Sequence, residues 1–95
     1  MKYIENIIGR AALLEQLAEE ASELAKAALK QSRIIRGENP TPVTLEKAYS
    51  DLIEEYSDVI QCSRELELQP DEEQITRKYV RWYSRINLHR EAIDE

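Results

Sequence analysis

The chain has 95 residues and a net charge of −6, with two glycines, three prolines and no phenylalanine. A chain of this length is expected to form one domain, and so few turn-forming residues exclude a small all-β domain. Ala, Leu, Glu, Lys, Arg and Gln are good helix formers and dominate the composition, so we expect an all-α fold. The negative charge argues against a nucleic-acid polymer or an anionic membrane as the main partner.

Cysteine usage and the first residues bear on location. Cys62 is the only cysteine, which excludes an intrachain disulfide and a cysteine-based metal cluster. The first ten residues include Glu5 and Arg10 and lack the apolar core of a signal peptide. No apolar run approaches the roughly 20 residues that span a bilayer. We therefore expect a cytoplasmic protein without a membrane partner.

The first predicted helix covers residues 10–35. Residues 2–8 before it are expected to form a short lead-in turn, with Gly9 as a hinge. Spacings of three and four residues are typical of one face of a helix. The apolar stripe with this spacing consists of Leu13, Leu17, Ala21, Leu24 and Ala28.

The second predicted helix covers residues 43–67. It follows a break at 36–44, where Gly37, Pro40 and Pro42 cannot continue a helix. Either Thr41 or Thr44 would cap its first turn. Its stripe consists of Leu45, Leu52, Tyr56, Val59, Ser63 and Leu66.

The third predicted helix covers residues 71–92. Pro70 makes the break before it, and the acidic residues from Asp71 onward favour a helix start. Its stripe consists of Ile75, Tyr79, Trp82, Ile86 and Ile93. Short connections favour an antiparallel bundle of these three main helices. Because their apolar arcs would stay partly exposed in a monomer, we expect a homodimer or homotetramer that completes a four-helix-type core.

One acidic pattern occurs twice, as LAEEASEL at 17–24 and LIEEYSDV at 52–59. On a helical wheel, the second Glu of each copy and the acid three residues later lie about 300° and 240° from the leucine that opens the copy. This places them on the flank of the apolar stripe. Four carboxylates share these offsets: Glu20, Glu23, Glu55 and Asp58.

Packed antiparallel through their stripes, the two helices would bring these carboxylates to one cleft. Their mutual repulsion would be relieved by a divalent cation, and oxygen ligands alone select a hard ion such as Mg²⁺ or Mn²⁺. Mg²⁺ commonly binds together with substrate phosphates, which indicates a phosphorylated ligand. Glu19 and Glu54 point further from the stripe and are expected to be solvated. The alternative is that both copies form a solvated acidic surface.

The third helix carries the opposite charge beside its stripe. Lys78, Arg81 and Arg85 take a similar flank position, where cations would contact phosphates. Trp82 could stack on a nucleobase, although it would also fit a core or an interface. Surface ion pairs are the alternative for the basic residues. His89 and Cys62 are expected to have no chemical part.

The two acidic motifs together resemble a known signature. Glu19-Glu20-x-x-Glu23 followed by Glu55-x-x-Asp58 resembles the EExxE…ExxD pattern of the MazG-like, all-α nucleoside triphosphate pyrophosphohydrolases, which are related to the dimeric dUTPases. The resemblance extends from about Leu13 to Ile86. It implies that Mg²⁺ is held by the four carboxylates at the matching positions: Glu20, Glu23, Glu55 and Asp58.

The family also carries Asn-x-Lys-x-x-Arg in the following helix. Lys78 and Arg81 match this pattern, whereas Thr76 stands at the asparagine position. The resemblance implies hydrolysis of an NTP or dNTP to the monophosphate and pyrophosphate. In that reaction Glu20 is our candidate for the general base, and Lys78 and Arg81 would stabilise the leaving pyrophosphate. The competing hypotheses are a non-catalytic helical interaction module and a nucleotide-binding sensor without turnover.

Overall fold

The computed structural model describes residues 3–38 and 42–94, and within them it contains four helices and no strand. The helices are α1 (Tyr3–Ile8), α2 (Arg10–Arg36), α3 (Leu45–Glu65) and α4 (Glu72–Asp94). The all-α prediction is therefore confirmed, and the three long helices occupy the expected segments. None of the helices in the described residues combines the length and the apolar character needed to cross a membrane.

The residues before Gly9 form a helix rather than a turn. Gly9 separates α1 from α2 with a φ of 89°, a backbone conformation that favours glycine. The backbone N–H groups of Ile4 and Glu5 donate to Oε1 of Glu65 at 2.6 and 3.2 Å. Because the first N–H groups of a helix lack partners within it, this buried carboxylate at the end of α3 fixes α1 against the hairpin that α2 and α3 form.

The other breaks follow the sequence closely. Gly37 ends α2 in the left-handed conformation, with a φ of 67°, as a helix C-terminus favours. Thr44 caps α3, since its Oγ1 accepts a hydrogen bond from the Lys47 N–H at 3.1 Å; Thr41 lies outside the described residues. Asp71 precedes α4 and accepts from the Gln74 N–H at 3.1 Å, which confirms the predicted helix start.

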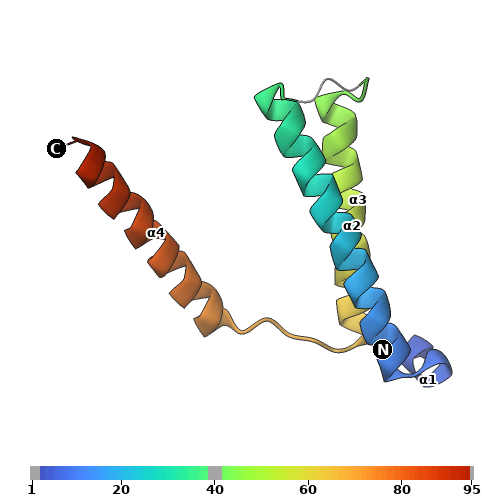
Figure 1. Cartoon of the computed structure of the whole chain (residues 1–95). Helices are drawn as coiled ribbons and strands as arrows, with labels where there is room; N and C mark the ends of the chain where they lie inside the picture. The colour runs from blue at the N-terminus through green and yellow to red at the C-terminus, as the bar shows by residue number, and fades with distance from the viewer. Residues whose placement is uncertain (1–2, 39–41, 95) are drawn as a thin grey trace.

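The core of the chain is the antiparallel pair of α2 and α3, which lie side by side along most of their length (Figure 1). Leu13, Cys62 and Leu66 form its buried cluster, and Leu17 packs against them. Ala48 is buried nearer the opposite end, at the start of α3. Small and branched apolar side chains thus allow the two helices to pack closely.

The contact face of the hairpin differs from the predicted stripes. On α2 it includes Glu20 and Ala27, whereas Ala21 and Ala28 are exposed. On α3 the predicted stripe members Leu45 and Tyr56 are exposed. Each helix has two neighbouring arcs of apolar residues, and α2 and α3 meet through only one of them. We call this contact the seam; its main positions are Leu13, Leu17, Glu20, Leu24 and Ala27 on α2, with Ala48, Leu52, Glu55, Val59 and Cys62 on α3.

Helix α4 stands apart from the hairpin (Figure 1). In the described residues it makes no packing contact with α1, α2 or α3. Its predicted stripe members Ile75, Tyr79, Trp82 and Ile86 are all exposed, and the side chain of Ile93 lies outside the description. The radius of gyration is 18.0 Å, against about 12 Å for a compact chain of this length. The three long helices therefore do not form a bundle within one chain.

Candidate functional site

Two of the predicted acidic residues interrupt the apolar seam between α2 and α3. Glu20 follows Leu17 and precedes Leu24 along α2, and Glu55 lies between Leu52 and Val59 on α3. Both glutamates are half-buried. The helical wheel placed them beside the stripe, whereas the structure places them in the contact itself. The hairpin thus holds carboxylates where leucine would pack better.

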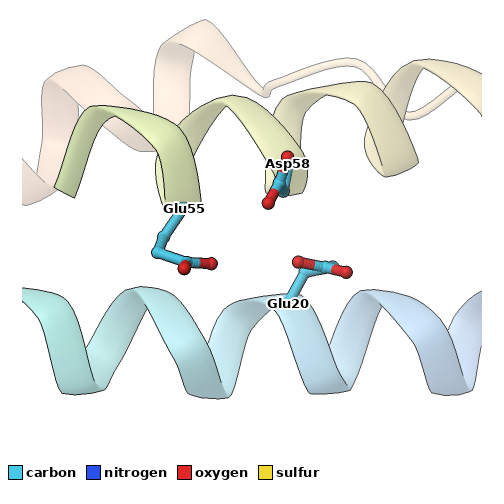
Figure 2. Close-up of side chains that lie close together, drawn as sticks. All are labelled: Glu20, Glu55 and Asp58. Atoms are coloured by element: carbon cyan, nitrogen blue, oxygen red, sulfur yellow. The ribbon is translucent and has the colours of Figure 1, made fainter. Parts of the chain in front are cut away.

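Asp58 joins these two residues to form a compact acidic cluster. One carboxylate oxygen from each of Glu20, Glu55 and Asp58 lies within 4.8 Å of the other two. Figure 2 shows Glu55 and Asp58 extending from α3 toward Glu20 on α2. Asp58 is exposed, so the cluster opens to solvent on its side. We call these three residues the acidic cluster.

The electrostatics of the acidic cluster are most evident at Glu55. Partial burial raises the pKa of its carboxyl, and the charges of Asp58, Glu23, Glu54 and Glu20 raise this pKa further. Loss of solvent contact and nearby negative charge both disfavour the ionised carboxylate. A neighbouring positive charge would therefore stabilise the ionised carboxylate of Glu55.

A glutamine that the sequence analysis did not single out supports Glu20. Nε2 of Gln16 donates to Oε1 of Glu20 at 2.8 Å, one helical turn away. The i, i+4 spacing is a signal that would have identified the pair, because such residues are neighbours on a helix surface. Cys62 lies close to Glu20. Burial raises the pKa of the Cys62 thiol, and the negative charge of Glu20 raises this pKa further.

Glu23 is not part of the acidic cluster. Its Oε1 pairs with Nζ of Lys26 at 3.6 Å, and its side chain is half exposed. It remains close enough to contribute to the raised pKa of Glu55. Glu23 and Glu55 also line one hollow of about 220 Å³, together with Lys26 and Lys30. The structure thus assembles three of the four predicted carboxylates and leaves the fourth beside them, while Glu19 and Glu54 are exposed as expected.

The basic residues predicted to bind substrate gather on α4. A hollow of about 400 Å³ is lined by Gln74 and by all four predicted residues, Lys78, Arg81, Trp82 and Arg85. Within the described part of the chain α4 does not contact α2 or α3. One chain therefore presents the acidic and the basic halves of the predicted site on separate bodies.

Comparison with known proteins found no relative of the chain. No protein-family model matches it, and neither the curated proteins nor the solved structures give a significant match. Chemical arguments about the site therefore depend on its own residues. Three hard oxygen donors at this spacing are suited to a small divalent cation. Acidic clusters also occur on protein surfaces without an ion, so the geometry defines a candidate site.

Proposed function

We propose that the protein is a Mg²⁺-dependent nucleoside triphosphate pyrophosphohydrolase that cleaves an NTP or dNTP to the monophosphate and pyrophosphate. The observation that carries the proposal is the acidic cluster, in which Glu20, Glu55 and Asp58 bring oxygens within 4.8 Å of one another across the α2–α3 seam. These residues belong to the paired motifs that resemble those of the MazG-like enzymes. The proposal includes this activity, a nucleoside triphosphate substrate and a cytoplasmic location.

The acidic cluster could hold a small divalent cation after its side chains draw closer together. Adjacent oxygens on one octahedral Mg²⁺ are about 3.0 Å apart and opposite ones about 4.2 Å, whereas those of the acidic cluster lie within 4.8 Å of one another. Glu23 could join after its side chain turns away from Lys26. When bound, Mg²⁺ or Mn²⁺ would supply positive charge beside the phosphate chain of the substrate.

Glu20 is the candidate for the general base that takes a proton from the attacking water, since it faces the other two carboxylates from α2 (Figure 2). Lys78 and Arg81 would stabilise the leaving pyrophosphate, with Arg85 and Trp82 as further substrate contacts.

The substrate contacts on α4 require an assembly larger than one chain. We propose a homodimer or homotetramer in which α4 joins a helical pair and a four-helix-type core is completed. The exposed apolar side chains of α4 support this arrangement, because water-exposed apolar surface of this extent favours association.

The test is Mg²⁺-dependent release of pyrophosphate, measured over the eight common NTPs and dNTPs. Glu20→Gln and Asp58→Asn are expected to abolish release while the far-ultraviolet circular dichroism stays unchanged. Glu19→Gln is the matched control, since it removes one neighbouring charge outside the acidic cluster and should retain activity. Wild-type protein that is inert with every nucleotide, in both Mg²⁺ and Mn²⁺, would refute the proposal.

The second candidate function is a helical interaction module. It is favoured by the exposure of large apolar side chains on α4, such as Tyr79 at 67% and Trp82 at 61%. Thermal denaturation separates the two candidates, because a ligand that binds only the folded state raises the melting temperature. No change with Mg²⁺ plus nucleotide favours the module, whereas tight nucleotide binding without product indicates a sensor.

A further inference from the structure

One chain exposes far more surface than a compact protein of its mass. Its accessible surface is 7870 Å², while a compact monomer of 11.1 kDa exposes about 5,700 Å². The excess is about 2,200 Å² per chain, whereas a standard interface buries about 800 Å² on each partner. The excess is therefore large enough for an extensive, permanent interface.

Part of this excess is an apolar face on the hairpin. Six exposed residues, which we call the open face, each follow a seam position by one residue, or about 100° of helix rotation. Because α2 and α3 are antiparallel, their turns advance in opposite senses when viewed from one end, so both sets lie on the same side of the hairpin. The open face consists of Leu14, Ala21 and Ala25 on α2 with Tyr49, Ile53 and Tyr56 on α3.

Helix α4 has a complementary surface. Its exposed stripe of Ile75, Tyr79, Trp82 and Ile86 is spaced by four, three and four residues. This matches the period of the open face. The α2 side of the open face offers alanines, which allow the large aromatic residues of a neighbouring helix to approach closely. A single helix with this stripe would fit along the two-helix surface.

Charge favours α4 over a second hairpin as the occupant. Residues 10–65 contain eleven acidic and seven basic residues, so two hairpins would repel each other. The four acidic residues of α4 lie at its two ends, and residues 74–90 between them contain five basic residues and no acidic one. Association of α4 with a hairpin therefore brings together charges of opposite sign.

The connection between α3 and α4 favours an occupant from another chain. The Leu68 N–H closes the end of α3 by donating to the Ser63 carbonyl at 3.0 Å. Pro70 then fixes its own φ and disfavours helical backbone at Gln69. Across this connection, α4 leads away from its own hairpin (Figure 1). The α4 of a second copy can reach the open face without refolding this connection.

We propose that two copies of the chain exchange α4, so that the apolar stripe of each α4 packs on the open face of the other copy. Exchange of an identical element is a common route to a symmetric dimer. The proposal holds whether or not the protein hydrolyses nucleotides, because Tyr56 of the open face and Asp58 of the acidic cluster are two residues, or about 200°, apart on α3 and so lie on different sides of the hairpin.

The test measures the mass of the full chain by sedimentation equilibrium, alone and in mixtures. The wild type is expected at twice 11.1 kDa or an even multiple of it. Ala25→Glu, on the open face, and Trp82→Glu, on α4, are each expected to be monomeric. The matched controls Ser22→Glu, at an exposed position of α2 about 200° from Glu20 in the seam, and Ser84→Glu, on the far side of α4, add the same charge and should retain the wild-type mass.

Mixing the two interface variants is the decisive step. In an exchanged pair, the intact α4 of Ala25→Glu can still occupy the intact open face of Trp82→Glu, so a one-to-one mixture should regain the dimer mass. This recovery would also prove that both variants are folded. A monomeric wild type, a dimeric Trp82→Glu variant or a mixture that stays monomeric would each overturn the exchange. An exchanged dimer that releases no pyrophosphate would refute only the hydrolase proposal.

Discussion

Replacement of Glu20 by leucine tests whether the acidic cluster is maintained at the expense of stability. Glu20 is half-buried in the seam, in register with Leu17 and Leu24. A fully buried leucine side chain contributes about 1.5–3 kcal/mol, so a half-buried one should contribute about 1 kcal/mol. The substitution also removes a negative charge that raises the pKa of Glu55. Both effects stabilise the hairpin without metal.

The expected result is a higher melting temperature for metal-free Glu20→Leu. For a domain of this size, about 1 kcal/mol corresponds to a shift of about 4–8 °C. The assay is thermal denaturation at pH 7 with a chelator, followed by circular dichroism. Glu19→Leu is the control, because an exposed site should change stability by less than about 0.5 kcal/mol.

The same variant should lose the response to metal. Wild-type protein is expected to melt at a higher temperature when Mg²⁺ and nucleotide are added, and Glu20→Leu is not. A more stable and inactive variant is the usual consequence of repairing a functional site. If Glu20→Leu were less stable than the wild type without metal, our placement of Glu20 in the seam would be wrong.

Three further predictions concern metal binding, pH and the core. Mg²⁺ at 100 times its Kd should stabilise the wild type by about 2.7 kcal/mol. In a thermal-shift titration, Asp58→Asn should lose most of this stabilisation. An equal shift in the variant and the wild type would exclude Asp58 as a ligand. The pKa of Glu55 is raised in the folded state, so the folded chain still holds this proton at a pH where the unfolded chain has lost it. As pH rises through the interval between the two pKa values, the contribution of Glu55 to the free energy of unfolding falls. Glu55→Gln should therefore show a shallower decline in urea denaturation at several pH values, and parallel curves for variant and wild type would contradict a raised pKa at Glu55. Leu66→Ala, at a side chain only 2% exposed, should cost about 2–5 kcal/mol in urea denaturation, against little change for the exposed Leu68→Ala.

The proposed exchange would explain why α4 has no packing partner among the described residues of its own chain. Packing of α4 on another copy would bury its apolar stripe of Ile75, Tyr79, Trp82 and Ile86. The stability of the folded protein would then rise with its concentration.

The sequence by itself determined the local structure. Gly9, Gly37 and Pro70 predict where helices are interrupted, because glycine permits the left-handed backbone seen at both glycines and proline fixes its own φ and lacks an N–H. Thr44, one of two candidate caps, and Asp71 were also predicted from local chemistry, because a side-chain oxygen can accept from an N–H of the first turn, and their hydrogen bonds confirm both helix starts. The repeated acidic motif also located all three residues of the acidic cluster.

Only the tertiary structure decided which faces of the helices meet. A helical wheel gives angles within one helix, but two adjacent apolar arcs on α2 and on α3 are each compatible with packing. The use of the arc that contains Glu20 and Glu55 moved these residues from the flank into the seam and left Glu23 paired with Lys26. The position of α4 likewise depends on the connection after Leu66 and on what covers its stripe. Such long-range choices are set by the packing of whole surfaces, which no local pattern contains.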